Sequence, residues 1–165
     1  MLCQSGTVLN FDFAHVHPNF SLSGNGSADV ALLHLVGPIY SIKPIALIDL
    51  DTAGLEANGS NALFAGWGQN EVESSPIHAS WISLTVLDFE TCEAMLSKFP
   101  WPVHFNQLTA FYWNVCTFDF RHKELVEAPC FGDSGGPLFA KDRAGDFVQL
   151  GCLSMGVGFC SGFLG

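Results

Sequence analysis

The feature that most restricts the fold of this chain is the nine-residue run Cys130–Leu138, with the sequence CFGDSGGPL. It contains the pattern G-x-S-x-G, which in one class of hydrolases places a nucleophilic serine between a strand and a helix. That arrangement needs a helix directly after the serine, but Gly135, Gly136 and Pro137 follow here and disfavour a helix body. The residues after Pro137 have the pattern of a strand. The run therefore predicts a serine in a glycine-rich loop that leads into a strand.

The rest of the chain reads as short strands between turns rich in Gly, Asn, Ser and Pro. The expected strands are Val8–Phe13, Val30–Leu35, Ala62–Gly66, Trp81–Asp88, Pro137–Ala140 and Phe147–Ser154. One helix is expected over Asp88–Leu96, because an N-cap residue and early acidic residues precede an apolar face. Many short strands with regular turns predict an all-β sandwich or barrel.

Composition excludes several classes of protein. The chain is 48% hydrophobic and 13% charged, which argues against intrinsic disorder. Its 16 acidic and 6 basic residues give a net charge of −10, which repels nucleic acid and anionic membranes. The uncharged stretch Phe147–Gly165 is as long as a membrane span, but its five glycines favour packed strands over a membrane helix. The start of the chain lacks the cationic and apolar regions of a secretory signal.

The run Cys130–Leu138 closely resembles the G-D-S-G-G-P signature of trypsin- and chymotrypsin-like serine proteases. The resemblance implies that Ser134 is the nucleophile and that the backbone N–H groups of Gly132 and Ser134 form the oxyanion hole. It also implies that Asp133 receives a new N-terminal amine on activation. The alternative, a glycine-rich turn with an incidental serine, fits the full nine-residue match poorly.

Further segments resemble the same family. Asp29–Leu33, with the sequence DVALL, is similar to the D-I-A-L-L segment, so the resemblance makes Asp29 the triad acid. By itself an Asp before an apolar strand is usually a turn residue. Gly66–Gly68 resembles the G-W-G strand of the second barrel. Ser154–Gly156 stands where the family has a Ser-Trp-Gly wall beside the substrate, with Met155 replacing the tryptophan.

The resemblance implies a fold of two antiparallel β-barrels of the chymotrypsin type, with one short intermediate helix and an incomplete first barrel. Residues 1–50 are expected to form the partial N-terminal barrel and residues 51–60 the connection. Residues 61–165 are expected to form the C-terminal barrel without its last strand and terminal helix. Because open barrels expose strand edges, we expect this polypeptide alone to be poorly stable or to aggregate.

The family also implies partners and a specificity. Its members cleave proteins or peptides outside the cell, and protease inhibitors are a further class of partner; no cofactor or metal is expected. The residue expected at the base of the primary pocket is an alanine rather than the aspartate of trypsin-like enzymes, which favours apolar or aromatic side chains. The residues expected to contact the substrate are Ala128, Phe131, Ser154, Met155 and Gly156.

Six cysteines are present, with no CxxC pair and no Cys/His cluster of the kind that binds zinc. Spacing alone leaves their pairing open. The resemblance implies the disulfides Cys92–Cys116 and Cys130–Cys160. A third family disulfide would join the positions of Ala62 and Ala140, so both of its cysteines are absent together. Cys3 has no family partner, and Cys152 is interpreted as a buried free thiol.

The triad histidine of the family, in an A-A-H-C segment, is absent. The chain has six histidines, which are His15, His17, His34, His78, His104 and His122, and each is interpreted as a surface or satisfied core residue. Two functions follow. The first is a serine endopeptidase represented by a fragment or truncated form that is inactive by itself. The second is a non-catalytic homologue that acts as a binding module or cofactor, which the missing histidine and the Met155 replacement favour. A serine esterase or an unrelated β-protein are weaker alternatives.

Overall fold

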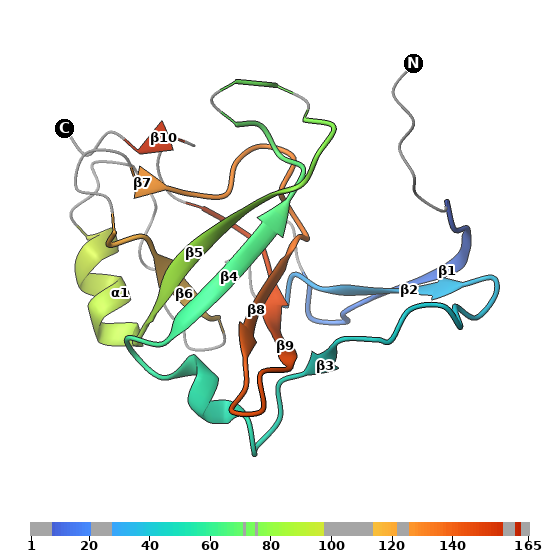
Figure 1. The fold of residues 1–165 in the computed structure, drawn as a ribbon, viewed down its shortest axis with the longest axis horizontal. Helices are drawn as coiled ribbons and strands as arrows, with labels where there is room; N and C mark the ends of the chain where they lie inside the picture. Colours follow the sequence, from blue (N-terminus) through green and yellow to red (C-terminus); the bar gives the residue numbers. More distant parts are fainter. Residues whose placement is uncertain are drawn as a thin grey trace.

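A computed structural model describes residues 8–20, 28–70, 72–74, 76–97, 114–121, 126–156 and 161–162. These residues form mostly strands (Figure 1). The strands are β1 (Phe11–Val16), β2 (Ala31–Leu35), β3 (Ala46–Leu47), β4 (Asn61–Gly66), β5 (Ser80–Leu87), β6 (Cys116–Phe118), β7 (Val126–Glu127), β8 (Pro137–Lys141), β9 (Phe147–Cys152) and β10 (Ser161–Gly162). A 3₁₀ helix, η1 (Ala53–Glu56), and an α-helix, α1 (Phe89–Leu96), complete the elements.

The centre of the molecule is a six-stranded sheet with the order β3-β9-β8-β4-β5-β6. All its neighbouring strands are antiparallel except β3 and β9, which are parallel. Alternate residues of β4, β8 and β9 are buried, as expected for strands with one face on a core. The buried cluster consists of Ala62, Phe64, Leu84, Val86, Leu138, Ala140 and Leu150. The sheet thus provides the hydrophobic core beside the loop Cys130–Gly136, which carries Ser134 and which we call the serine loop.

The two positions of the absent third disulfide lie in this core. The register that pairs Leu63 with Phe139 places Ala62 opposite Ala140 on the neighbouring strand. Ala62 is 0% and Ala140 2% exposed. Two small, buried apolar side chains therefore occupy the positions at which the family disulfide would lie.

The N-terminal strands form a separate two-stranded unit. β1 and β2 pair antiparallel, and the hairpin extends away from the six-stranded sheet at the right of Figure 1. Its large apolar side chains are exposed, including Phe11 at 56% and Leu32 at 71%. β7 and β10 make a second two-stranded unit. Among the described residues the sheets do not close into barrels, as expected for an incomplete chymotrypsin-type fold.

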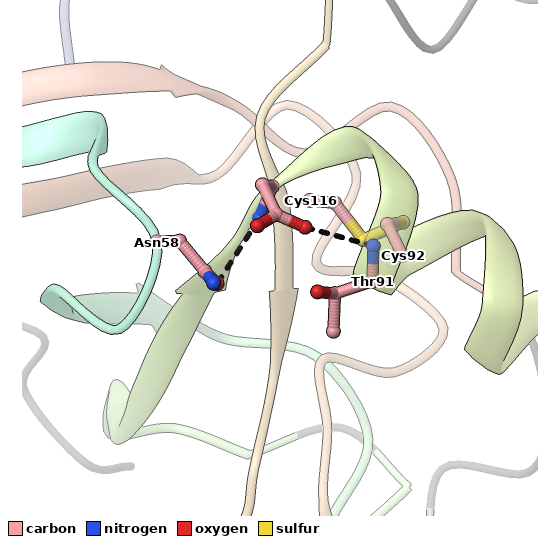
Figure 2. The surroundings of a disulfide bond; sticks show 5 residues. Asn58, Thr91, Cys92 and Cys116 are labelled. Atoms are coloured by element: carbon pink, nitrogen blue, oxygen red, sulfur yellow. Dashed lines mark hydrogen bonds between the residues drawn. A yellow bond between two sulfur atoms is a disulfide. The ribbon is translucent and has the colours of Figure 1, made fainter.

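The predicted helix is confirmed. Asp88 is the N-cap of α1, and its side chain accepts a hydrogen bond from the N–H of Thr91 at 2.8 Å. The backbone N–H of Asp88 donates to Oδ1 of Asn58 at 3.2 Å, which ties the helix start to the turn before β4. Cys92 of the helix is disulfide-bonded to Cys116 of β6, as Figure 2 shows. The disulfide predicted from the family resemblance is therefore confirmed, and it fixes α1 against the edge of the sheet.

All six expected strands are present, with shifted ends. The largest shift is in the first one, which runs over Phe11–Val16 instead of Val8–Phe13, because its extent is set by pairing with Ala31–Leu35. The short strands β3, β6, β7 and β10 were not predicted. None of the helices within the described ranges is long and apolar enough to span a membrane.

Candidate active site

Ser134 lies in a tight loop between Cys130 and the first residue of β8. The loop is closed by hydrogen bonds from the N–H of Asp133 to the carbonyl of Cys130 at 3.0 Å and from the N–H of Gly136 to the carbonyl of Asp133 at 2.8 Å. Gly132 and Gly135 have φ angles of 95° and 79°, which side-chain-bearing residues adopt only with strain. The glycines of the signature are therefore required by the turns on either side of Ser134. Ser134 itself is exposed.

The carboxylate of Asp133 points into the protein, opposite to the exposed serine. It is 9% exposed and accepts hydrogen bonds from the N–H of Gly68 at 2.7 Å and of Cys130 at 2.8 Å. Gly66 and Gly68 are needed at this approach, because a Cβ on either one would overlap the Asp133 carboxylate. The G-W-G segment and the serine loop are thus packed through one buried carboxylate.

Asp29 is joined to the segment beside the serine loop. Its Oδ2 accepts a hydrogen bond from the hydroxyl of Ser154 at 2.8 Å, although the two residues are 125 positions apart. The preceding residue, Leu153, accepts from the N–H of Gly135 at 2.8 Å and donates to the carbonyl of Gly136 at 2.9 Å. The structure therefore brings Asp29 and Ser154 to the same end of the sheet as the serine loop.

The backbone beside Asp29 is unusual. Ala28 has a φ of 58°, the left-handed region that non-glycine residues seldom occupy. Its carbonyl accepts a hydrogen bond from the N–H of Val30 at 2.9 Å, two residues on. This tight turn precedes β2 and presents the exposed Asp29 side chain toward Ser154.

A cavity of about 490 Å³ lies on the Asp133 side of the serine loop. Its lining includes Gly68, Trp81, Glu127, Ala128 and Asp133. Of the five residues predicted to contact substrate, only Ala128 lines this cavity. Phe131 and Met155, which are 81% and 49% exposed, lie outside its lining together with Ser154 and Gly156. The cavity is thus distinct from the surface that carries most of the predicted substrate contacts.

The sequence reading missed a charged cluster next to Ala128. Asp119 follows β6 and is 1% exposed. Its Oδ1 accepts from the N–H and the Nε of Arg121 at 2.9 and 3.1 Å, and its Oδ2 accepts from the N–H of Glu127 at 3.1 Å. The Nη2 of Arg121 also donates to Oε2 of Glu127 at 2.9 Å. The available signal was weak: an aspartate between Phe118 and Phe120 with an arginine two residues on.

Three of the histidines lie on or beside the β1–β2 hairpin. Nδ1 of His34 is 2.8 Å from Oδ1 of Asp12. The ring of His15 packs on Phe13 with 4.4 Å between centroids, and Nδ1 of His17 accepts a backbone hydrogen bond at 3.2 Å. Each of these three rings therefore has a local partner in or beside the hairpin. His104 and His122 lie outside the described residues.

No group of three metal-ligating side chains is found where the structure describes the chain. Two carboxyl groups near the disulfide have shifted pKa values. The Thr91 hydroxyl and then its N–H lower the pKa of Asp88. Burial raises the pKa of Glu56, which lines a cavity of about 220 Å³ beside Cys92 and Cys116.

The remaining cysteines divide into two groups. Cys130 is disulfide-bonded, while its predicted partner Cys160 lies outside the described residues, as does Cys3. Cys152 is a free thiol, as expected, but the prediction that it is buried is wrong. β9 has an irregularity opposite Leu138 and Phe139, where the partner changes from Gly151 to Gln149. The extra residue turns Cys152 to the outer face, where the Nε2 of Gln149 lies 3.2 Å from its sulfur.

Comparison with known proteins covers almost the whole chain. The sequence model of the family described as Trypsin matches residues 4–163. Phenoloxidase-activating factor 3 of Holotrichia diomphalia is 31% identical over 146 residues, which cover 85% of this chain and 38% of that protein. Testisin of Homo sapiens is 30% identical over 82% of this chain and 41% of its own length. Clotting factor C of Tachypleus tridentatus is 34% identical over 86% of this chain and 14% of its own length. The chain thus spans about two-fifths or less of these relatives.

Proposed function

Because the chain belongs to the trypsin family of serine proteases, we propose that it carries most of a peptidase site that hydrolyses peptide bonds through an acyl-enzyme on Ser134. The observation that carries the proposal is the hydrogen bond between Asp29 and Ser154. It holds a carboxylate from the N-terminal hairpin beside the loop that presents Ser134. The family order of acid before serine agrees with this arrangement.

In the proposed reaction the hydroxyl oxygen of Ser134 attacks the substrate carbonyl, and an imidazole takes its proton. Asp29 orients that imidazole and stabilises its cationic form. The N–H groups of Gly132 and Ser134 receive the oxyanion. Among the described residues neither of these N–H groups donates to a protein acceptor, which supports their availability for a ligand.

None of the six histidines stands in an A-A-H-C segment of the kind that supplies the triad imidazole, so we propose that these 165 residues are inactive by themselves. In this family the loss of one triad member leaves roughly 10³–10⁴-fold acceleration over water. The exposed apolar side chains of the β1–β2 hairpin support the view that further protein covers this unit in the active form.

We propose that activation places a newly formed N-terminal amine against Asp133. The 490 Å³ cavity at that carboxylate, lined also by Phe64, Val72 and Ile82, has room and apolar surface for a terminal residue. The proposed substrates are secreted proteins or peptides. Ala128 favours an apolar or aromatic side chain before the scissile bond, since no carboxylate stands at that position to bind Lys or Arg.

A fluorophosphonate probe tests the proposal, because it reacts only with an activated serine. We expect it to label Ser134 in a form of the protein that includes an A-A-H-C segment and has been activated, and not to label a Ser134→Ala variant. An in-frame A-A-H-C segment in the coding sequence upstream of Met1 would support the peptidase.

The second candidate function is a non-catalytic homologue that binds other proteins. The absent histidine and Met155 in place of the family tryptophan favour it. Absence of labelling in the activated long form, with intact folding, would support this candidate over the peptidase.

A further inference from the structure

The short segment Glu127–Cys130 is held at both ends by buried carboxylates. The N–H of Glu127 donates to Oδ2 of Asp119 at 3.1 Å, and the N–H of Cys130 donates to Oδ2 of Asp133 at 2.8 Å. Asp119 is 1% and Asp133 9% exposed, so water competes little for either bond. Hydrogen bonds to a charged acceptor are stronger than those between neutral groups. The segment is therefore anchored at its first and last residues.

The middle of this segment has little freedom of its own. Pro129 fixes its φ near −65° and has no N–H, so Ala128 supplies the one remaining backbone donor between the anchors. Ala128 and Pro129 are half-buried in the wall of the 490 Å³ cavity. The position of Ala128 is thus determined by the two anchors.

Arg121 makes the anchor at Asp119 possible. A buried carboxylate is costly unless a cation and further donors compensate it. Arg121 provides this through its N–H and Nε, while its Nη2 holds the side chain of Glu127 at 2.9 Å. The Arg121 side chain is 44% exposed, so it lies at the surface side of the buried Asp119 carboxylate. We name Asp119, Arg121 and Glu127 the carboxylate clip.

We infer that Asp119 is a positioning residue: through the carboxylate clip it sets the place of Ala128 and thereby the selectivity for the substrate side chain before the scissile bond. The inference rests on the proposed peptidase function. Asp119 need not touch the substrate, because Ala128 is the residue that the family resemblance expects at the base of the primary substrate pocket, and a shift of Ala128 changes the depth of that pocket. Ser134 and its oxyanion N–H groups lie beyond the second anchor, at Asp133, and their intrinsic reactivity is expected to be independent of the clip.

The test compares two kinds of probe in the activated form of the protein whose Ser134 reacts with fluorophosphonate. One is a simple alkyl fluorophosphonate with no side chain for the pocket. The other is a series of peptidyl phosphonates that carry Phe, Leu or Ala before the phosphorus. Asp119→Asn removes one acceptor with little change in shape. We expect it to lower the second-order rate constant for the Phe and Leu probes roughly tenfold, the equivalent of one lost buried hydrogen bond. The rate with the simple probe should stay within about twofold.

Asp142→Asn is the matched control. Asp142 also accepts two backbone N–H bonds, from Ala144 and Asp146 at 2.9 Å each, but in the β8–β9 turn. It should change neither rate. Arg121→Lys is a second variant for the case in which Asp119→Asn does not fold. It keeps the positive charge but cannot bond Asp119 and Glu127 at once as the guanidinium does, so it should show the same selective loss with the Phe and Leu probes. An equal loss with all probes, or no loss with the Phe and Leu probes, would overturn the inference.

Amide hydrogen exchange tests the positioning without any reactivity. In the activated form of the protein Asp119→Asn should speed exchange of the Glu127 N–H by about tenfold or more. The Cys130 N–H, which Asp133 holds, should change little, and Asp142→Asn should affect neither. Unchanged exchange at Glu127 would show that Asp119 does not hold the segment, and the inference would fail. If unmodified activated protein does not react with the simple probe, the proposed function fails instead, and the exchange result decides the positioning separately.

Discussion

The contact between Gly66 and Asp133 makes a sharp prediction about stability. A Cβ built on Gly66 would overlap Oδ1 of Asp133, would lie 2.9 Å from its Cγ and would lie 3.2 Å from a ring atom of Phe64. Neither neighbour is free to move, because the carboxylate is buried and hydrogen-bonded and Phe64 is 3% exposed in the core. The substitution Gly66→Ala should therefore displace the Asp133 side chain.

The expected cost has two parts. Overpacking in a dense core costs roughly 1–3 kcal/mol. Displacement of the carboxylate weakens the bond to the N–H of Gly68, and a hydrogen bond to a charged group contributes about 1.5–3 kcal/mol. Together these predict a loss of roughly 2.5–6 kcal/mol in the free energy of unfolding. For a domain of this size the thermal midpoint falls by about 2–4 °C for each kcal/mol.

Urea unfolding of Gly66→Ala and of a matched strand glycine measures the effect. Gly151 lies in β9 of the same sheet, and a Cβ there meets nothing within 4 Å. Gly151→Ala should be neutral or stabilising by about 0.4–1 kcal/mol, through the unfolded state. In an Asp133→Ala background the cost of Gly66→Ala should shrink, because the overlapping carboxylate is gone. Equal midpoints for the two glycine variants, or a cost unchanged without Asp133, would refute the reasoning.

Four further outcomes follow from local geometry. Thr91 lowers the pKa of Asp88, so the cap stabilises the fold above the ordinary carboxyl range, and this stabilisation is lost as pH falls through the lowered pKa. Asp88→Ala should therefore reduce the acid dependence of helix content, measured by circular dichroism. Burial raises the pKa of Glu56, so its ionisation destabilises the fold as pH rises through the raised value. The thermal midpoint of Glu56→Gln should therefore exceed that of the unmodified protein by more at pH 7 than at pH 4. Ala28→Gly should raise the free energy of unfolding by about 1 kcal/mol by relieving the left-handed φ, and an unchanged urea midpoint would contradict this. Maleimide should modify Cys152 without denaturant, as located by peptide mass mapping, and protection of this thiol would contradict its exposure.

Most of the strands could be predicted because each is a short apolar or alternating run between turn residues. In β4 the run Ala62–Gly66 is apolar throughout, so it predicted a strand, but the structure alone shows that Ala62, Phe64 and Gly66 are the buried residues. The helix was equally accessible, since Asp88 is a side-chain cap that acts within three residues. The short strands β3 and β7 have two residues each, too few for any period. Their existence depends on partners that are distant in the sequence.

The candidate site was predictable where a motif carries it and not where packing decides. Ser134 and Asp29 were proposed from the resemblance to the family, and the structure adds the hydrogen bond from the Ser154 hydroxyl to Asp29, which connects the N-terminal hairpin to the segment beside the serine loop. The exposure of Cys152 depends on the irregular pairing of β9, and one extra residue there reverses the face of all that follow. The buried Asp119 is compensated by Arg121, whose Nε donates to its carboxylate. The spacing of apolar residues in the sequence does not indicate such a contact.

The arrangement around Asp133 couples distant parts of the sequence through one shared space. Gly66, Gly68 and Gly136 lack side chains for one reason, because a Cβ at each would enter the space of Asp133 or of the Phe64 ring beside it. The loop that presents Ser134 can form only if this space is kept for the carboxylate, since the same residue also closes the loop through its backbone N–H and carbonyl. A side chain introduced in the G-W-G segment should therefore impair reactivity at Ser134 without touching it. Partial rescue of the free energy of unfolding by a smaller residue at position 133 would separate this steric coupling from a direct role of Gly66 in the fold of β4.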